Sequence, residues 1–256
     1  MKEQFPKISV VTVTYNCASV LETTLQSILA QDYPNFESLI IDGHSTDGTL
    51  DIIHKYADRL AYWKSEPDKG IFDAMNKSLR VVTGEWVCFM NAGDTFASSS
   101  VLTDIFGSNA PSIDPDVACI HGQTWELHPR KRVREKSHPF YKNRNIFRPM
   151  GFCHQAVFVR TDWARRVGGF DLSYKIASDY RMLYSIYEKG GKFMETDVDV
   201  ACIDVNGVSA QNRMTQHKEV ARICNCSHDP RFLIWLAYKW LRSNTKVILL
   251  KIIGRN

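Results

Sequence analysis

The stretch GEWVCFMNAGDTF (residues 84–96) decides how this chain is expected to fold. Its apolar run at residues 86–90 has the length and composition of a buried β-strand. The run stops at Asn91-Ala92-Gly93-Asp94, so an amide and a carboxylate follow directly after the strand. Polar groups in this position are typical of a sheet that binds its ligand at the carboxyl ends of its strands.

Length and composition set the broad class. The chain has 256 residues, which suits one large domain or a domain with an appendage. It is 44% hydrophobic and 23% charged, as ordinary globular proteins are, and a net charge of +4 is too small for a dedicated nucleic-acid binder. Seven cysteines, an odd number, favour free thiols in the cytosol. Neither an export signal nor a membrane-spanning helix is predicted.

Strand and helix patterns alternate along the first hundred residues. Strands are predicted at residues 8–13, 36–42, 60–64 and 85–90, and helices at 19–31, 49–56 and 71–82. Strands separated by helices of this length indicate βαβ units and a parallel sheet. The second half is less regular, with strands predicted at 155–159 and 198–205 and helices at 161–167 and 178–189.

Polar segments follow all four strands of the first half, so they are expected to meet at one edge of the sheet. The segments are Thr14-Tyr15-Asn16, residues 42–48, residues 65–70 and residues 91–94. They contain neither the glycine fingerprint of dinucleotide-binding folds nor a phosphate-binding P-loop. The remaining interpretation is a site whose oxygen ligands hold a divalent cation, which in turn binds a diphosphate. Asp94 is the first candidate ligand and Asn91 the second; the alternative is a simple turn.

Seven motifs together carry a family resemblance. They are SVVTVTYN, ESLIIDGHSTDGT, SEPDKGIFDAMNKSL, GEWVCFMNAGDTF, CHQAVFVRTD, GGFD and IASDYRMLYSIYEKG, and they span about residues 8–190. In this order they resemble the inverting GT-A glycosyltransferases of family 2, which include enzymes of bacterial exopolysaccharide, capsule and O-antigen assembly. The small members of colanic-acid-like gene clusters are the most similar. The resemblance implies an α/β, Rossmann-like GT-A fold at residues 1–212, with a mostly parallel sheet, and a basic helical appendage at 213–256.

The resemblance also implies roles for individual residues. Asp42 corresponds to the carboxylate that reads the nucleotide base, commonly uracil, and Tyr15 to an aromatic residue beside that base. Asp94 corresponds to the last acid of the metal-binding DxD motif, in which Asn91 and Gly93 replace the usual residues. Mg²⁺ or Mn²⁺ is the implied cofactor. The residues implied for the nucleotide-sugar pocket are Thr14, Tyr15, Asn16, Asp42, Asp68, Asp73 and Asn76.

Asp179 matches the catalytic base of the family. Inversion is a single displacement in which an acceptor hydroxyl attacks the anomeric carbon, so a carboxylate must accept the hydroxyl proton. Asp179 follows Ser178 at a predicted helix start, where the helix dipole favours an ionised acid. The alternative is an acid that only stabilises the helix. His154 and Gln155 align with a segment near the donor sugar or the acceptor, although a lone histidine beside a strand is more often structural.

The expected activity is transfer of one sugar, with inversion, from a nucleotide-diphosphate sugar, with a UDP-sugar as the expected donor. The acceptor is expected to be a glycan or a polyprenyl-pyrophosphate-linked saccharide in bacterial surface polysaccharide biosynthesis. The processive synthases of the family carry a Q-x-x-R-W motif, which this chain lacks. Two alternatives stay open. A sugar nucleotidyltransferase would have a glycine-rich basic loop after the first strand, and a nucleotide-sugar-binding protein without transfer activity would fit the changes at Asn91 and Gly93.

Two basic regions complete the sequence. Residues 128–148 carry eight Lys or Arg and one acid, Glu135, which suits either a solvated hairpin or loop or a grip on phosphate. Residues 230–256 contain no acid and mix basic with apolar and Trp residues. Such a segment suits a helix on an anionic membrane surface, although it could equally pack on the domain. The expected location is cytoplasmic, with peripheral attachment to the inner membrane.

Overall fold

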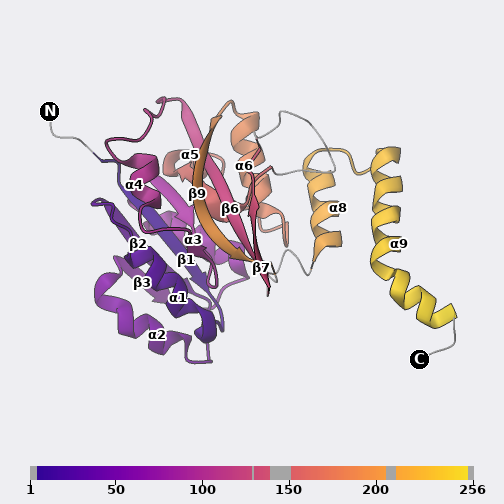
Figure 1. Cartoon of the computed structure of the whole chain (residues 1–256), viewed down its shortest axis with the longest axis horizontal. Coiled ribbons are helices and arrows are strands. Elements are labelled where there is room, and N and C mark those ends of the chain that lie inside the picture. Colours follow the sequence, from indigo (N-terminus) through magenta and orange to yellow (C-terminus); the bar gives the residue numbers. More distant parts are fainter. Residues whose placement is uncertain (1–4, 129, 139–150, 206–211, 253–256) are drawn as a thin grey trace.

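The computed structural model describes residues 5–128, 130–138, 151–205 and 212–252, which form one sheet with helices on both faces (Figure 1). The strands are β1 (Ile8–Thr14), β2 (Phe36–Asp42), β3 (Tyr62–Ser65), β4 (Trp86–Phe89), β5 (Thr95–Phe96), β6 (Val117–His128), β7 (Lys131–Glu135), β8 (Val157–Arg160) and β9 (Lys192–Asp204). The α-helices are α1 (Ala18–Leu29), α2 (Thr49–Tyr56), α3 (Ile71–Val81), α4 (Val101–Phe106), α5 (Thr161–Arg166), α6 (Ser178–Glu188), α8 (Arg213–Ile223) and α9 (Pro230–Ile252). Two short 3-10 helices are η1 (Ala57–Arg59) and η2 (His154–Ala156).

The first four strands form the parallel half of the sheet, as predicted. β1 pairs in parallel with β2 and β4, and β2 pairs in parallel with β3. Every residue of β1 is buried, as expected for a strand with helices over both faces. The order β3-β2-β1-β4 places β2 and β4 on opposite sides of β1. Ligands of α/β proteins bind in the crevice at such a switch point, beyond the carboxyl ends of the strands.

The second half makes the sheet mixed. β8 is antiparallel to β4 and β6, β9 is parallel to β6, and β5 is antiparallel to β9. The α/β fold is confirmed, but a mostly parallel sheet describes only the half up to β4. β6 was not predicted, because its middle residues are polar. Its buried His121 and Gln123 bond to Ser137, which satisfies their polar atoms inside the sheet.

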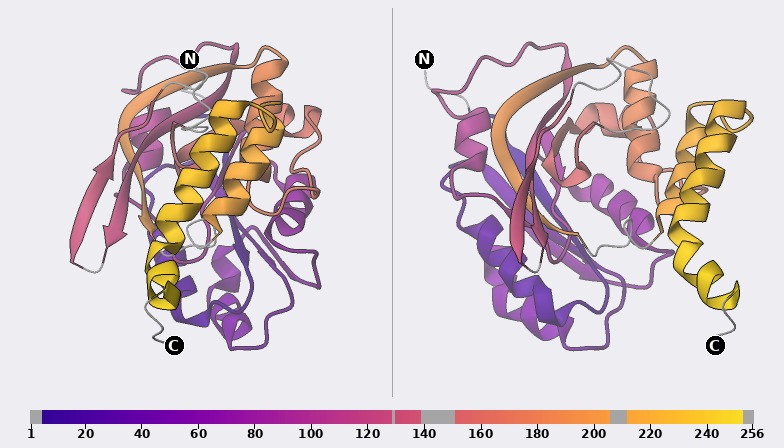
Figure 2. Two further views of the ribbon diagram at one scale, coloured as in Figure 1. Left: turned by 90° about the vertical axis from the view of Figure 1, so that its right-hand side faces the viewer. Right: turned by 45° about the vertical axis from the view of Figure 1, so that its right-hand side comes forward.

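The helices form layers on the two faces of the sheet, seen most clearly in Figure 2. Core residues of α1, α2 and α4 pack on one face, and those of α3, α5 and α6 pack on the other. Val220 and Ile223 of α8 belong to the same core as the residues of α3, α5 and α6. α9 lies on the outer side of α8. The domain boundary at 212/213 stays a prediction. The buried residues of α8 pack into the core of the predicted glycosyltransferase domain. All seven cysteines are free.

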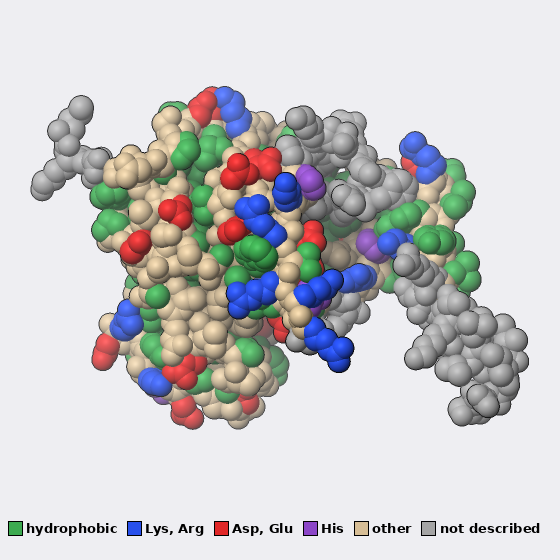
Figure 3. All heavy atoms as spheres, viewed as in Figure 1, with side chains coloured by type: hydrophobic (Ala, Val, Ile, Leu, Met, Phe, Trp, Pro, Cys, Tyr) green, Lys and Arg blue, Asp and Glu red, His purple; other side chains and the backbone are tan. Residues whose placement is uncertain are grey.

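The predicted basic stretch at residues 128–148 begins as a hairpin. β7 pairs antiparallel with the end of β6, and residues 139–150 lie outside the described part of the chain. Figure 3 shows Lys and Arg side chains gathered over this hairpin. The exposed ones are Arg130, Lys131, Arg132, Arg134 and Lys136. Arg134 pairs with Asp199 at 2.6 Å, so this cation also fastens the hairpin to β9.

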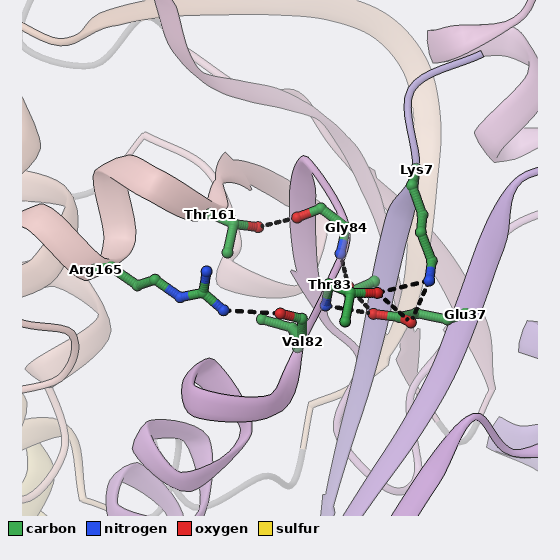
Figure 4. Close-up of polar contacts among 8 residues, drawn as sticks. Lys7, Glu37, Val82, Thr83, Gly84, Thr161 and Arg165 are labelled. Atoms are coloured by element: carbon green, nitrogen blue, oxygen red, sulfur yellow. Dashed lines mark hydrogen bonds and ion pairs between the residues drawn. The ribbon is translucent and has the colours of Figure 1, made fainter. Parts of the chain in front are cut away.

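A buried carboxylate, Glu37, fixes the chain where it enters β4 (Figure 4). It accepts hydrogen bonds from Ser9 Oγ at 2.6 Å and from Thr83 N at 2.7 Å, and Lys7 Nζ lies 2.7 Å away. On the other side, Arg165 donates to the carbonyl of Val82 at 2.7 Å. These contacts hold the segment between α3 and β4. They thereby help to set where β4 begins and where its carboxyl end falls.

Replacing Glu37 with Gln is expected to lower the free energy of unfolding at pH 7 by about 2–3 kcal/mol. Burial opposes ionisation of Glu37, but its hydrogen bonds and Lys7 outweigh it and lower its pKa to about 2. The pKa is below the ordinary value of 4.5, so the stabilisation is fully present above pH 4.5 and is lost as pH falls toward 2. Urea unfolding at pH 7 and pH 3 should show a smaller difference at pH 3.

Glu22 provides the matched control, because its carboxylate also pairs with a lysine, Lys55, at 2.7 Å but on the surface. Glu22→Gln should change the free energy of unfolding far less than Glu37→Gln. The same difference between wild type and Glu37→Gln at both pH values would contradict the assignment.

Candidate active site

A groove of about 2150 Å³ lies at the carboxyl ends of β1 to β4. In the order of the strands in the sheet, Thr14, Tyr15, Gly43 and Asp68 line one end of it, after β1 to β3, and residues 91–94 after β4 line its middle together with Gln155. The other end is lined by residues of β6, α8 and α9, which are Glu126, His128, Arg213, His217, Lys239 and Trp240. The polar segments that the sequence placed after separate strands therefore meet in one groove.

The loop after β1 is locked to the loop after β2. Asn16 has a left-handed backbone, with φ of 47°, and its Oδ1 accepts a hydrogen bond from Thr46 N at 2.8 Å. Its own N donates to Ser45 Oγ at 2.8 Å. Tyr15 directly precedes the anchored Asn16, and it is 67% exposed and lines the groove. An exposed ring at this place offers a flat apolar surface to a planar ligand.

Asp42 lies beneath the groove rather than on its surface. It is fully buried, and its Oδ1 accepts hydrogen bonds from Thr14 Oγ1 at 2.8 Å and Ser45 Oγ at 2.5 Å. Its Oδ2 accepts from Ser45 N at 2.9 Å and Ser65 Oγ at 2.6 Å. Burial alone would raise the pKa of Asp42, but these hydrogen bonds lower it below the ordinary value. Asp42 therefore stays ionised and joins the ends of β1, β2 and β3.

Two residues of α3 that were predicted to line the nucleotide-sugar pocket, Asp73 and Asn76, form hydrogen bonds with backbone groups of the protein. Asp73 accepts a hydrogen bond from Lys69 N at 3.0 Å. Asn76 donates to the carbonyl of Phe170 at 2.7 Å and accepts from its N–H at 2.8 Å. α3 presents Ile71 and Ala74 to the groove instead. A direct contact of Asp73 or Asn76 with a nucleotide stays a prediction.

The predicted metal ligands follow β4 in a tight turn. Asp94 N donates to the carbonyl of Asn91 at 3.0 Å, and Gly93 between them has φ of 99°, which side chains rarely adopt. Asp94 is buried and accepts hydrogen bonds from Gln155 Nε2 at 2.9 Å and from Asp204 N at 3.2 Å. Burial raises its pKa to about 6.

The turn has groups that fit a hard divalent cation. Among the described residues, Asn91 Oδ1 has no hydrogen-bond partner, although it is buried in the same turn as the Asp94 carboxylate. In the described part of the chain, no cluster of three or more His, Cys, Asp or Glu could hold a metal alone. Mg²⁺ commonly takes one or two protein oxygens and completes its shell with waters and substrate phosphates. Asn91 and Asp94 suit that kind of incomplete site.

η2 connects this turn to the predicted base. Its Gln155 donates a hydrogen bond to Asp94. The preceding His154 is buried, and neither of its ring nitrogens has a hydrogen-bond partner in the part of the chain that the structure describes. The imidazole stacks on Phe89 at 5.6 Å, and it interacts electrostatically with Asp179. Burial lowers the pKa of His154, so the ring is neutral, and burial raises the pKa of Asp179. Asp179 is partly buried beside Cys153, which lines the groove.

Glu219 on α8 is a residue of this region that the sequence did not reveal. Its carboxylate accepts hydrogen bonds from three consecutive backbone N–H groups, Lys175 at 2.8 Å and Ile176 and Ala177 at 2.9 Å. These residues lead directly into α6, whose first turn carries Asp179. Glu219 therefore positions Asp179 through the backbone. A lone glutamate in a predicted helix gives no signal of this task.

Solved structures define the class of the fold. S. aureus TarS 1–349 in complex with UDP-GlcNAc matches with a TM-score of 0.67 and 20% identity, over 85% of this chain and 65% of that chain. The mannosyltransferase PcManGT from Pyrobaculum calidifontis, in complex with GDP-Man and Mn²⁺, matches with a TM-score of 0.67 and 20% identity, over 98% of this chain and 80% of that chain. The fold is therefore of the GT-A type, a Rossmann-like α/β fold with a curled mixed sheet.

Sequence relatives give the family. Residues 9–167 match the family described as glycosyl transferase family 2. A PGL/p-HBAD biosynthesis glycosyltransferase of Mycobacterium bovis is 30% identical over 181 residues, 68% of this chain and 67% of that protein. The Escherichia coli UDP-Glc:alpha-D-GlcNAc-diphosphoundecaprenol beta-1,3-glucosyltransferase WfaP is 33% identical over 99 residues, 38% of this chain and 39% of that protein. This chain belongs to glycosyl transferase family 2.

Proposed function

We propose that this chain transfers one sugar, with inversion, from a nucleotide-diphosphate sugar to a saccharide acceptor in surface polysaccharide or glycolipid biosynthesis. One observation supports the proposal: Gln155 of η2 donates a hydrogen bond to Asp94, and His154 of the same short helix interacts electrostatically with Asp179. Asp94 and Gln155 line the groove, and Asp179 lies behind Cys153, which also lines it. A displacement at a sugar carbon needs both a group that takes charge from the leaving diphosphate and a base for the incoming hydroxyl.

In this mechanism the nucleotide lies at the end of the groove lined by Tyr15 and Asp68, and the diphosphate lies over residues 91–94. A divalent cation held by Asp94 and Asn91 would neutralise charge on the leaving diphosphate. Asp179 accepts the proton of the acceptor hydroxyl, and its raised pKa brings it closer to the basicity that this task requires. His154 stays neutral, so its ring can donate one hydrogen bond and accept another.

We propose a UDP-sugar or GDP-sugar as the donor and a lipid-linked saccharide as the acceptor. Relatives and structural neighbours support this choice, because they are named for UDP-Glc, UDP-GlcNAc, GDP-Man and a diphosphoundecaprenol acceptor. At the end of the groove away from Tyr15 and Asp68, Arg213, Lys239 and the exposed Trp240 combine positive charge with apolar surface. That combination suits a saccharide carried on a lipid phosphate.

The proposal is tested by incubating the purified full chain with UDP- and GDP-sugars, Mn²⁺ or Mg²⁺, and saccharide or polyprenyl-pyrophosphate-saccharide acceptors. Release of nucleoside diphosphate coupled to one added sugar per acceptor, with the anomeric configuration inverted in the NMR spectrum, is expected. Transfer with retained configuration would contradict the single displacement, and long product ladders would contradict transfer of a single sugar. Failure to bind any of the donors would overturn the whole assignment.

We further propose that α9 attaches the protein to an anionic membrane surface. Leu233, Ile234 and Tyr238 of α9 are 49%, 72% and 55% exposed. Their spacing in the helix puts them within one half of its circumference. No acid follows Asp229, whereas six basic residues do. None of the helices in the described residues is long and apolar enough to cross a membrane. A basic helix with an exposed apolar face suits the interface of an anionic bilayer.

The triple substitution Leu233→Ser/Ile234→Ser/Tyr238→Ser is expected to weaken binding to phosphatidylglycerol vesicles at least about 10-fold, because each exposed apolar side chain loses its burial in lipid. Co-sedimentation measures this, with phosphatidylcholine vesicles for comparison. Leu172→Ser is the matched control, since Leu172 is 47% exposed elsewhere. Equal vesicle binding by the triple variant and wild type would exclude the proposal. A change of oligomeric state without vesicle binding would assign the face to a second copy of the chain.

A further inference from the structure

Two carboxylates stand at the end of the groove where the nucleobase is proposed to bind, and only one of them can accept a new hydrogen bond. Asp42, the residue that the family resemblance implied as the base reader, is fully buried. Both its oxygens already accept two hydrogen bonds each, from Thr14, Ser45 and Ser65. Four bonds fill the acceptor capacity of a carboxylate. Asp42 therefore has none left for a ligand.

Asp68, in contrast to Asp42, still has capacity to accept a hydrogen bond. Its Oδ1 accepts one hydrogen bond, from Gly70 N at 2.7 Å, which holds the loop after β3 in a turn. Within the part of the chain that the structure describes, no protein donor reaches its Oδ2. Asp68 is partly exposed and lines the groove together with Tyr15. It thus presents one unused carboxylate oxygen to a ligand.

Gly43, the residue directly after Asp42, makes room for this arrangement. A β-carbon on Gly43 would lie only 2.5 Å from Asp68 Oδ2. The Asp68 carboxylate therefore occupies the space that a side chain at position 43 would fill. Since Gly43 N donates to the carbonyl of Thr14 at 2.8 Å, that space adjoins the end of β1, directly before Tyr15. The unused oxygen and the exposed ring belong to the same corner of the groove.

We propose that Asp68 selects the nucleobase of the donor. Its unused carboxylate oxygen accepts a hydrogen bond from a ring N–H on the edge of the base. Stacking on Tyr15 tolerates every base, so the edge must supply the discrimination. Uracil presents one ring N–H, and guanine presents a ring N–H beside an amino group. Cytosine and adenine have a bare ring nitrogen, an acceptor, at the corresponding position. A carboxylate therefore favours uracil and guanine and repels the other two. This inference depends on the proposed function and adds the residue that sets its nucleotide specificity.

Asp68→Asn tests the proposal with little change in shape. The Asn Oδ1 can still accept the bond from Gly70 N, so the turn is retained, while Nδ2 replaces the unused acceptor with a donor. A charged hydrogen bond of this kind accounts for about 10- to 100-fold in affinity. Binding of UDP, GDP, CDP and ADP to the full chain is measured by calorimetry with Mn²⁺ present. Wild type should bind the tighter of UDP and GDP at least about 10-fold better than CDP.

In Asp68→Asn, that preferred nucleotide should bind about 10- to 100-fold more weakly, while CDP binds as well as before or better. A uridine diphosphate methylated at N3 should bind wild type as poorly as CDP. Asp47→Asn is the control, because Asp47 Oδ1 accepts a similar hydrogen bond within a turn, from Thr49 N at 3.1 Å, and Asp47 is not among the residues that line the groove. It should keep the wild-type order of nucleotides.

These measurements distinguish failure of the role of Asp68 from failure of the proposed function. If Asp68→Asn keeps the wild-type ratio of UDP or GDP to CDP, Asp68 does not read the base, although the proposed function stands. If wild type binds none of the four nucleotides, the proposed function falls, and the inference falls with it.

Discussion

Asp179→Asn is expected to lower the rate of sugar transfer about 10²- to 10⁴-fold, the usual contribution of a general base. Donor affinity should stay within about 2-fold of wild type, because the amide keeps the shape of the side chain and only the proton transfer is lost. Burial raises the pKa of Asp179 above its ordinary value of 3.8. Wild-type activity should therefore fall on acidification, as Asp179 takes up a proton, and the variant should lose this dependence. Transfer rates at saturating donor across pH 4 to 9 measure both effects.

Asp162→Asn is the matched control for this substitution. Like Asp179, Asp162 is the acid in the first turn of a helix, but its side chain is 64% exposed and is not among those that line the groove. It should keep wild-type transfer activity and pH dependence. If Asp179→Asn transferred sugar at the wild-type rate, Asp179 would be an ordinary helix acid, and the base would have to be sought elsewhere along the groove.

Asp94→Asn is expected to reduce transfer about 10²- to 10³-fold or more, because a cation that loses its carboxylate ligand no longer stabilises the leaving diphosphate by several kcal/mol. In contrast to Asp179→Asn, this substitution should weaken donor binding, and the loss should appear only when a divalent cation is present. Chelation of divalent cations should reduce wild-type activity to a similar level. Titration with Mn²⁺, followed by calorimetry and by transfer rate, measures both effects.

Asp116→Asn is the comparison for Asp94→Asn, since it removes a carboxylate that pairs with Lys192 at 2.9 Å on the surface, away from the groove. It should leave the cation dependence unchanged. Full wild-type activity of the protein in excess chelator, with Asp94→Asn equally active, would contradict a metal-dependent mechanism.

The first half of the fold was predictable because its strands and helices are determined by patterns of neighbouring residues in the sequence. The apolar runs of β1, β2 and β4 are buried on both faces, so their sequences are continuous and easily distinguished from the helices between them. Polar groups at the carboxyl ends of parallel strands must meet, whatever the details of packing. The convergence of Tyr15, Asp68 and Asp94 on one groove follows from this rule.

The second half depends on contacts between distant residues, which the sequence does not display. β6 carries polar residues that are stable inside the sheet only because Ser137 and Thr196 satisfy them. A helix-period pattern also does not tell which polar side chain faces a ligand. Asp73 and Asn76 bond to backbone, whereas their neighbours Ile71 and Ala74 line the groove. Glu219 positions Asp179 by hydrogen bonds to Lys175, Ile176 and Ala177, which precede Glu219 by more than forty residues in the sequence.

The most direct test of the central claim is a crystal structure of the full chain with UDP or GDP and Mn²⁺, with the cation located by its anomalous scattering. We expect a manganese peak beside Asp94 and the diphosphate, and a base that stacks on Tyr15 with its edge at Asp68. A nucleotide bound outside this groove, or a manganese ion on the diphosphate but away from Asp94, would contradict it.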